Sequence, residues 1–494
     1  MNDTHIHLPA GEIKGTADDG ILKFLGVPYA APPTGQARFA LPQPVEPWSG
    51  VRDTTAPGPV APQRIRPFPA LDVTPLVGEG GPQGDDFLTL NILKPQHAAG
   101  LPVMVFIHGG GFVLGSKDAP VQDGTRLAQS GMVFVAINYR LGVEGFLPIP
   151  GVPTNLGLRD MIAALKWVQD NITAFGGDPA NVTVFGESAG AMAIANLVAS
   201  PLAQGLFRRA IVQSGHGSMV RSIPVAQRLV RKVARLLKVT PDEAGFCTTD
   251  PMEAAAVIEK LASPWKIDLR DDEGFEPVFG ISRFIPVYGD DVLPQHPLDA
   301  LRAGVGADVE LLIGTNSEEM RLYFVPTGVS EKIPGLLARW LVGRSMPKAR
   351  KALAAYGWGL KGNKPGHVMT EALSDLVFRW PARQFAAAHR GTTHIYEFDW
   401  RSPACNGELG ACHGIELPFV FDTLATVTGT RGLAGEVPPQ ELADRVHKLW
   451  VRFATDGALP WDRFDTNTRK VRQLWADCTI SEPVMPAAQF LPRA

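Results

Sequence analysis

The chain of 494 residues has few cysteines and no long apolar run, and both absences limit its class. Its cysteines are too few and too irregularly spaced for a disulfide framework: Cys247, Cys405, Cys412 and Cys478. No apolar stretch reaches the ~18 residues that a membrane-spanning helix requires. The first residues, MNDTHIHLPAGEIKG, lack the cationic and apolar regions of a signal peptide. We therefore expect a soluble, cytoplasmic protein with reduced thiols, a disulfide between Cys405 and Cys412 being the less favoured alternative.

The chain also lacks an excess of charge of either sign. Its net charge is −3, which predicts neither a basic surface for nucleic acid nor a cationic face for anionic membranes. Hydrophobic content of 45% and charged content of 20% are typical of a globular protein with an ample core. No motif for a cofactor is present, and His5 and His7 are better explained by a mobile N-terminal tail than by a metal site.

Buried strands and amphipathic helices alternate along the chain after about residue 100, where a region rich in β-structure and proline ends. This alternation is typical of a doubly wound α/β sheet. Between Asn155 and Phe175, apolar residues recur at helical spacing and predict a helix that packs on the sheet. The expected strands are 103–107, 132–137, 182–185, 209–213, 309–313 and 393–398.

The segment VTVFGESAGAMAIANLVA at 182–199 combines a strand, a sharp turn and an apolar helix around Ser188. A Gly-x-Ser-x-Gly sequence in this setting is typical of a nucleophile elbow, which lifts the serine hydroxyl out of the sheet. Gly186 and Gly190 leave room for the tight turn, and the helix N-terminus favours developing negative charge. The alternative is a glycine-rich helix entry with an uninvolved serine.

A second glycine-rich turn follows the apolar run of PVMVFIHGGGF at 102–112. Bare backbone N–H groups in such a turn can stabilise the oxyanion of a tetrahedral intermediate. We assign the N–H groups of Gly110, Gly111 and Ala189 to this role. Taken alone, the three glycines would be better explained as a tight loop.

A serine nucleophile requires a base, and the base requires a carboxylate to orient it. In α/β-hydrolases the order along the chain is serine, acid, histidine, which favours His413 in GACHGIELPFVF. Its unperturbed pKa predicts activity that rises through about 6.5 to 7. For the acid, VELLIGTNSEEM places Glu318 and Glu319 directly after a buried strand, and the pattern alone does not separate them. The other later histidines considered lie in polar, helical or strand-like surroundings: His296, His367, His389 and His394.

These motifs together resemble the type-B carboxylesterase and cholinesterase family of α/β-hydrolases. The resemblance implies a large, mostly parallel sheet flanked by helices, and a hydrolase that cleaves carboxylic esters through an acyl-enzyme. It also implies Glu319 as the acid and a place for Ser214 behind the triad, the alternative being a strand-end hydroxyl that caps the backbone. Glu187 is a further residue expected to support the triad. The segments that carry the resemblance are FLGVPYAAPPTGQARF at 24–39, DDFLTLN at 85–91, HGGGF, NYRLGVEGFL at 138–147, FGGDPANVTVFGESAG at 175–190, FRRAIVQSG at 207–215, GTNSEE and GACHGIELPFVF.

Departures from the family pattern bear on the substrate. Residues 71–84 contain no aromatic residue, so the tryptophan that holds a quaternary ammonium in cholinesterases is missing. Gly280 and Ser282 stand where cholinesterases have aromatics, which implies an acyl pocket larger than acetyl requires, and we expect Phe112 and Phe284 to line it. Phe87 and Ala61 replace the cysteines of a surface disulfide.

Met320 stands where the family usually has glycine, which leaves open the geometry of the loop after Glu319.

The whole chain, 1–494, is expected to form one α/β-hydrolase domain, with helical insertions at 218–280 and 320–390 that form a lid and pocket walls. The expected partner is a small-molecule ester, and the sequence leaves the oligomeric state open, with a monomer as one alternative. Two alternatives stay open: the same triad acting on a carbamate, amide or lactone, and a non-catalytic adhesion or binding protein. The second is disfavoured because all three triad residues are present.

Overall fold

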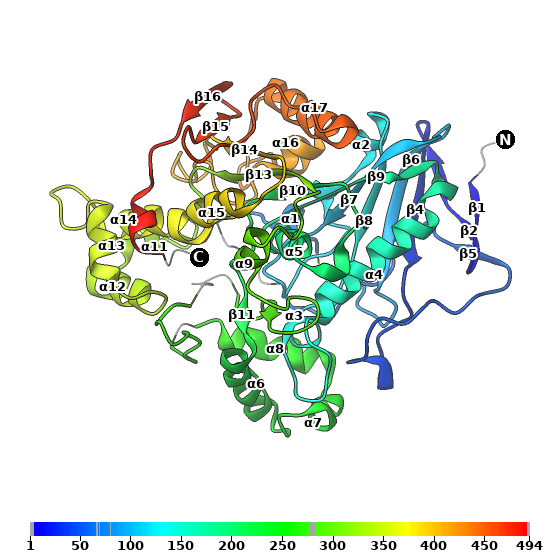
Figure 1. Cartoon of the computed structure of the whole chain (residues 1–494), viewed down its shortest axis with the longest axis horizontal. Helices are drawn as coiled ribbons and strands as arrows, with labels where there is room; N and C mark the ends of the chain where they lie inside the picture. The colour runs from blue at the N-terminus through cyan, green and yellow to red at the C-terminus, as the bar shows by residue number, and fades with distance from the viewer. Residues whose placement is uncertain are drawn as a thin grey trace.

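A twisted sheet of 11 strands forms the centre of the molecule, in the order β16-β15-β14-β13-β10-β9-β7-β8-β6-β4-β3 (Figure 1). The computed structural model describes residues 4–65, 68, 70–79, 81–263, 265–276 and 282–491. Along the chain the strands of this sheet are β3 (Thr16–Asp18), β4 (Ile21–Pro28), β6 (Thr89–Pro95), β7 (Leu101–Ile107), β8 (Val133–Ile137), β9 (Gly177–Glu187), β10 (Arg209–Gln213), β13 (Glu310–Asn316), β14 (Thr393–Phe398), β15 (Lys470–Gln473) and β16 (Cys478–Ser481).

The strands from β8 to β15 pair in parallel, and antiparallel strands complete both edges of the sheet. Each of the six strands predicted from apolar runs is confirmed to within a few residues at its ends. Side chains alternate between the two faces as the two-residue period requires: Val103 and Val105 enter one apolar core, whereas Met104 and Phe106 enter the other. This is the predicted α/β-hydrolase architecture, with the long apolar strands at its centre.

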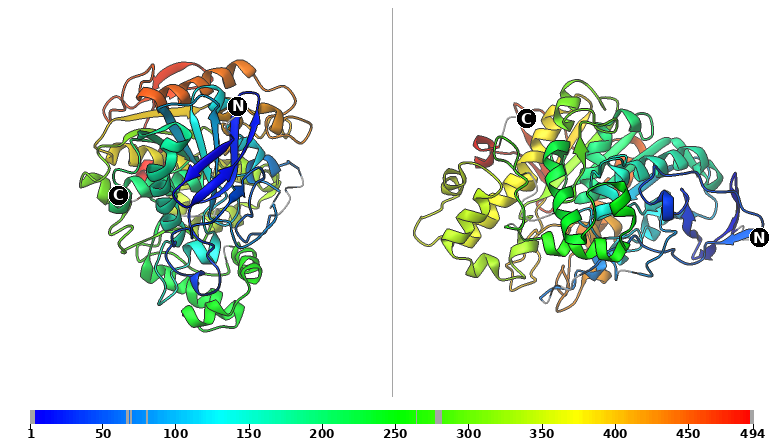
Figure 2. Two further views of the ribbon diagram at one scale, coloured as in Figure 1. Left: turned by 90° about the vertical axis from the view of Figure 1, so that its right-hand side faces the viewer. Right: turned by 90° about the horizontal axis from the view of Figure 1, so that it is seen from below.

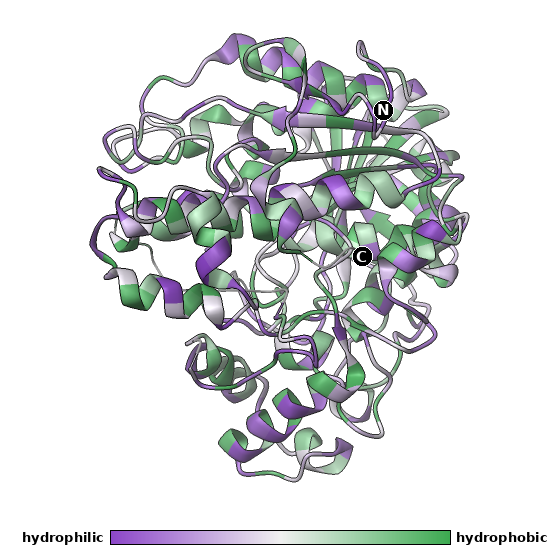
Figure 3. Ribbon diagram, turned by 60° about the vertical axis from the view of Figure 1, so that its left-hand side comes forward, coloured by the Kyte–Doolittle hydropathy of each residue, from purple (hydrophilic) through white to green (hydrophobic). Residues whose placement is uncertain are grey.

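Helices cover both faces of the sheet, as Figure 3 shows with its largely green strands between mixed green and purple helices. On one face lie α4 (Leu156–Asn171) and α5 (Ala189–Val198), whose buried residues join the first core. On the other face α2 (Thr125–Gln129), α16 (Leu417–Phe421) and α17 (Gln440–Asp456) contribute to the second core. Shorter helices outside the two insertions include α1 (Thr74–Val77), α3 (Gly142–Phe146) and α9 (Pro297–Arg302).

The N-terminal residues form a separate sheet of three strands, β1 (His5–Leu8), β2 (Gly11–Lys14) and β5 (Val51–Asp53). The prediction of a mobile tail around His5 and His7 is therefore wrong. The antiparallel pairing of β1 with β2 brings Nδ1 of His5 within 2.7 Å of Oε1 of Glu12. The sequence signal was weak because a four-residue strand contributes little apolar burial.

Residues 218–280 and 320–390 hold most of the helices outside these layers. The first segment contains α6 (Ile223–Leu237), α7 (Glu243–Cys247) and α8 (Pro251–Leu261), and β11 (Arg221–Ser222), which pairs with β12 (Val287–Tyr288). The second contains α10 (Arg321–Phe324), α11 (Val329–Lys332), α12 (Gly335–Gly343), α13 (Ala349–Ala355), α14 (Pro365–Ser374), a π-helical turn at Asp375–Arg379 and α15 (Trp380–Ala388). In Figure 2, α12 to α14 lie at the opposite end of the molecule from β1 and β2.

All four cysteines are free, so the alternative disulfide between Cys405 and Cys412 is wrong. Within the described ranges, no helix has the length and apolar character needed to span a bilayer.

Candidate active site

Ser188 lies on the sharp turn between the end of β9 and the start of α5. Its φ and ψ are 54° and −123°, a strained conformation for a residue with a side chain. Its backbone N–H donates to the carbonyl of Gln213 on the neighbouring strand, at 3.0 Å. A Cβ at Gly190 would lie 2.0 Å from the carbonyl oxygen of Ile107, and one at Gly186 would lie 2.5 Å from the same oxygen. Glycine is therefore required at both positions, as the sequence predicted.

The loop after β14 brings His413 against Ser188. Nε2 of His413 lies 2.8 Å from Oγ of Ser188, and its Nδ1 lies 2.7 Å from Oε2 of Glu319. All three side chains are buried. The three residues come from sequence positions far apart, and the fold assembles them in the geometry of a nucleophile, a base and an orienting acid.

The structure separates the two neighbouring acids that the sequence pattern left tied. Glu319 is fully buried and contacts His413, whereas Glu318 turns toward the surface. There Glu318 forms ion pairs with Arg321, at 2.8 Å, and with Arg401. Oε2 of Glu318 also accepts a hydrogen bond from the backbone N–H of Ala411 at 2.9 Å, which ties its loop to the one that carries His413.

Glu319 is held by two further hydrogen bonds to its Oε1. The Oγ of Ser214 donates at 2.7 Å, and the backbone N–H of Asn316 donates at 2.8 Å. Ser214 adopts a positive φ of 52° directly after β10, which aims its hydroxyl at the acid. With both oxygens engaged, the carboxylate has one orientation toward His413. Met320 is buried beside it, and its N–H donates to Oγ of Ser374 at 3.0 Å, which fixes the start of the following loop.

Glu187 is a second carboxyl group at the imidazole. Its Oε1 lies 3.1 Å from Nε2 of His413, the same nitrogen that faces Ser188. Burial raises the pKa of Glu187 to about 8. Burial alone would lower the pKa of His413, but nearby carboxylates, led by Glu187 and Glu319, outweigh it and raise that pKa to about 9. Beside an ionised Glu187, His413 therefore holds its proton to a higher pH than an isolated imidazole, and we expect the activity to rise at a pH above the range of about 6.5 to 7 predicted from sequence.

Several residues around the triad were not predicted. Glu416 is fully buried and accepts hydrogen bonds from the side chains of Gln213, at 3.1 Å, and Asn316, at 2.7 Å. The ring of Phe378 lies 4.6 Å from that of His413, and the ring of Tyr323 lies 5.6 Å from it. The only available signal was the position of Glu416 three residues after His413, because the two aromatic residues lie within helical segments of the 320–390 insertion that carry no motif.

The glycine turn of residues 109–111 lies beside Ser188. A Cβ placed on Gly109 would be 3.2 Å from Cβ of Ser188 and 2.8 Å from Oε2 of Glu187, so a side chain cannot be accommodated there. Gly110 and Gly111 have φ of 103° and 63°, and no hydrogen bond from their N–H groups is present among the described residues. Ala189 is the first residue of α5, where an N–H has no acceptor within the helix.

The predicted pocket residues have different surroundings. Phe112 is buried with its ring 4.5 Å from that of Phe146, and Phe284 is also buried. Ser282 is partly buried, with its Oγ bonded to the backbone N–H and carbonyl of Phe284, both at 3.2 Å. Gly280 lies outside the described residues.

A cavity of about 160 Å³ is lined by residues of both insertions, and neither a triad residue nor a predicted pocket residue is among the described residues that line it. Residues 218–225, 269–275 and 376–384 contribute to it, among them Val377. Val377 also accepts a hydrogen bond from Nε2 of His216, at 2.7 Å, and directly precedes Phe378, whose ring contacts His413. The two insertions therefore meet around this cavity, and Val377 joins its wall to the residue whose ring contacts His413.

Comparison with known proteins gives the family. A model described as "Carboxylesterase family" matches residues 2–486. The chain belongs to the carboxylesterase family. It is similar to the para-nitrobenzyl esterase of Bacillus subtilis, with 36% identity over 489 residues that cover 95% of this chain and 94% of that protein. The phenmedipham hydrolase of Pseudarthrobacter oxydans is 34% identical, covering 91% of this chain and 90% of its own.

Solved structures of the carboxylesterase family agree with the fold described above. A structure of PNB esterase superposes with a TM-score of 0.83 at 34% identity, covering 98% of this chain and 99% of its own. A carboxylesterase of Geobacillus stearothermophilus gives a TM-score of 0.81 at 32% identity, covering 97% and 98%. This protein is a type-B carboxylesterase, a serine esterase on the α/β-hydrolase fold.

Proposed function

We propose that the protein hydrolyses carboxylic esters through an acyl-enzyme on Ser188, with His413 as base and Glu319 as the acid that orients it. One observation carries the proposal: Nε2 of His413 lies 2.8 Å from Oγ of Ser188, while Nδ1 lies 2.7 Å from Glu319. This arrangement leaves the unprotonated Nε2 facing the hydroxyl and holds the proton of the neutral imidazole on Nδ1.

In the proposed reaction Oγ of Ser188 attacks the carbonyl carbon of the ester while His413 takes the hydroxyl proton. The backbone N–H groups of Gly110, Gly111 and Ala189 bind the oxyanion that forms. His413 then returns the proton to the departing alcohol, and water removes the acyl group by the same steps in reverse. Glu319 stabilises the imidazolium formed in between, with its carboxylate 2.7 Å from Nδ1, and Glu187, 3.1 Å from Nε2, adds to this when it is ionised.

The proposed substrates have acyl groups larger than acetyl. Ser282 stands where cholinesterases have an aromatic side chain, and a cavity of about 160 Å³ is lined by Val377, the neighbour in sequence of the Phe378 that contacts His413. Each buried methylene contributes about 0.8 kcal/mol until the space is filled. A series of p-nitrophenyl esters from acetate to long chains, measured as kcat/KM with Ser188→Ala as control, tests this. We expect butyrate or hexanoate to exceed acetate; a profile that peaks at acetate would contradict the larger pocket.

Carbamate hydrolysis by the same residues is a second candidate, because the phenmedipham hydrolase of Pseudarthrobacter oxydans is 34% identical over most of both chains. Phenmedipham and p-nitrophenyl butyrate assayed side by side distinguish the two. Turnover of the carbamate at a rate close to that of the ester would support the second candidate, and loss of both in Ser188→Ala would assign them to one site.

A further inference from the structure

The end of the molecule formed by residues 332–370 carries charge of one sign. We call it the cationic end; it comprises α12, α13 and the first part of α14. Its formal charge is +8 in a chain whose total is −3, because it contains eight basic residues and no acidic one. The basic residues are Lys332, Arg339, Arg344, Lys348, Arg350, Lys351, Lys361 and Lys364. This is the cationic face that the net charge of the whole chain did not predict.

Large apolar side chains project from the same end. On α12, Leu336 is 77% exposed, Leu337 41% and Trp340 42%, whereas Ala338 and Val342 are buried. The helical period places the three exposed residues on the outer face of α12, together with Arg339. In Figure 3, with this end turned forward, hydrophobic and hydrophilic residues alternate along its helices.

Two further apolar residues extend this surface. Leu360, in the loop between α13 and α14, is 65% exposed. Trp265 follows α8 in the other insertion, is 62% exposed, and has its ring 6.2 Å from that of Trp340. Such a group of large apolar side chains in water marks an interaction surface.

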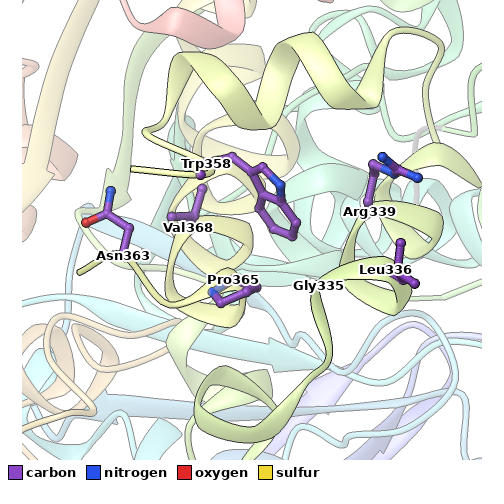
Figure 4. A pocket seen from close by; sticks show the side chains of 8 residues that line it. Gly335, Leu336, Arg339, Trp358, Asn363, Pro365 and Val368 are labelled. Atoms are coloured by element: carbon purple, nitrogen blue, oxygen red, sulfur yellow. The ribbon is translucent and has the colours of Figure 1, made fainter. Parts of the chain in front are cut away.

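A hollow of about 330 Å³ opens on this surface between α12 and the loop before α14. Figure 4 shows the indole of Trp358 within it, with Val368 and Pro365 on one side and Arg339 and Leu336 at the other. Gly335 allows the close approach, since a Cβ there would lie 3.3 Å from the indole. The hollow thus offers an apolar floor beside a guanidinium group.

The positive charge at this end is compensated only in part. Asp268 pairs with Arg270 and Arg344, and Glu331 pairs with Lys364 and His367. The acidic turn of residues 271–274 lies against Pro347. Within the part of the chain that the structure describes, six of the basic residues form no salt bridge: Lys332, Arg339, Lys348, Arg350, Lys351 and Lys361.

From this combination we infer that the cationic end docks on an anionic lipid bilayer, with Leu336, Trp340 and Leu360 entering the interface and the basic residues facing the lipid phosphates. Leucine and tryptophan beside lysine and arginine are the composition of interfacial membrane-binding surfaces. A second copy of this chain that docked by the same face would bring two +8 surfaces together and is repelled. A nucleic acid would use the charge but leave the leucines exposed to water.

Flotation with vesicles tests the inference on the full chain carrying Ser188→Ala, so that no lipid is hydrolysed. We expect binding to vesicles of phosphatidylcholine with phosphatidylglycerol, little binding to pure phosphatidylcholine, and loss of binding in high salt. Trp340→Ser should reduce binding. The control is Trp475→Ser, because Trp475 is 48% exposed and lies between β15 and β16, away from the cationic end; this variant should bind as before. Lys361→Glu should weaken binding about tenfold or more, since each basic residue near such a surface contributes ~1 kcal/mol. The matched control is Lys166→Glu on α4.

Other results would overturn it. Equal binding to neutral and anionic vesicles, or equal losses in the test and control variants, would remove the role of this surface. Binding to a DNA duplex without binding to vesicles would assign it to nucleic acid, and a dimer abolished by Leu336→Ser would assign it to a second copy. In the chain with Ser188 intact, the same substitutions should keep wild-type turnover of p-nitrophenyl esters. Failure of this inference is therefore distinguishable from failure of the proposed reaction.

Discussion

The site around Ser188 and the cationic end differ in where their ionisable side chains lie: buried in the first and exposed in the second. Around Ser188 the ionisable side chains are buried, and Glu319 has both oxygens in hydrogen bonds. At the cationic end, Lys332, Arg339 and Lys361 lie exposed among leucines and tryptophans. A buried hydrogen-bond network holds its side chains in one geometry, which the cleavage of one particular bond of the substrate requires. An exposed surface of mixed character fixes no geometry within the chain and is suited to an external partner.

Substitutions in the triad should separate the two regions most strongly. Because the three residues act as a unit, Ser188→Ala and His413→Ala should each reduce kcat by roughly 10⁴-fold or more, and the double variant should lose little further activity. Arg339→Glu at the cationic end should keep kcat on soluble esters within about twofold, as a surface substitution away from the site. Steady-state kinetics on p-nitrophenyl butyrate checks both. Additive losses in the double variant would mean that one residue acts outside the triad.

The adjacent residues Glu318 and Glu319 allow a buried carboxyl group to be compared directly with a partly exposed one. Glu319→Gln should reduce kcat by roughly 10³- to 10⁴-fold, because an amide does not stabilise the imidazolium in the same way. Glu318→Gln removes a partly exposed carboxylate that pairs with Arg321 and Arg401, and should leave most activity. The two variants are matched in chemistry and adjacent in sequence. The reverse ranking would transfer the acid role to Glu318.

The pH profile reports on Glu187. His413 accepts a proton only when neutral, so kcat/KM should rise with pH through the apparent pKa of the His413 and Glu187 pair, displaced above 6.5. Glu187→Gln removes the leading carboxylate that raises this pKa, so the acid limb should move to lower pH. Glu318→Gln serves as the control and should leave the limb in place. An unchanged or upward-shifted limb in Glu187→Gln would show that this carboxyl does not act on the imidazole.

The smallest expected effect concerns the acyl pocket. Ser282→Phe should lower kcat/KM for hexanoate relative to acetate by roughly 15- to 60-fold, since an added ring fills the space of about two or three methylenes at ~0.8 kcal/mol each. The chain-length profile of the variant against wild type measures this. An unchanged profile would mean that the walls near Val377, and not the segment around Ser282, limit the acyl chain.

The sequence predicted the parts of the molecule that local chemistry determines. The apolar runs identified the strands, and the glycines around Ser188 identified the turn, because only glycine fits against the carbonyl of Ile107. The choice of Glu319 over Glu318 required the family resemblance, since two adjacent glutamates after one strand are equivalent by pattern. In the structure they differ because Glu318 binds the backbone N–H of Ala411.

Other features depend on contacts between distant segments, which no local pattern contains. Glu416 accepts hydrogen bonds from Gln213 and Asn316, which lie about 200 and 100 residues earlier in the chain. The packing of Phe378 on His413 joins the 320–390 insertion to the triad. The strand at His5–Leu8 was missed because it is defined by its antiparallel pairing with β2, which its own four residues do not reveal. The cationic end was missed because the net charge of −3 averages over the whole chain.

Covalent trapping with diethyl p-nitrophenyl phosphate tests the central claim most directly. The reagent phosphorylates an activated serine and releases p-nitrophenol, and the product is stable enough for peptide mass analysis. The proposed mechanism predicts one diethylphosphoryl group per chain, on the peptide that contains Ser188, in step with the loss of esterase activity and absent in Ser188→Ala. A modification at any other residue that accompanies the loss of activity, or full activity in Ser188→Ala, would contradict it.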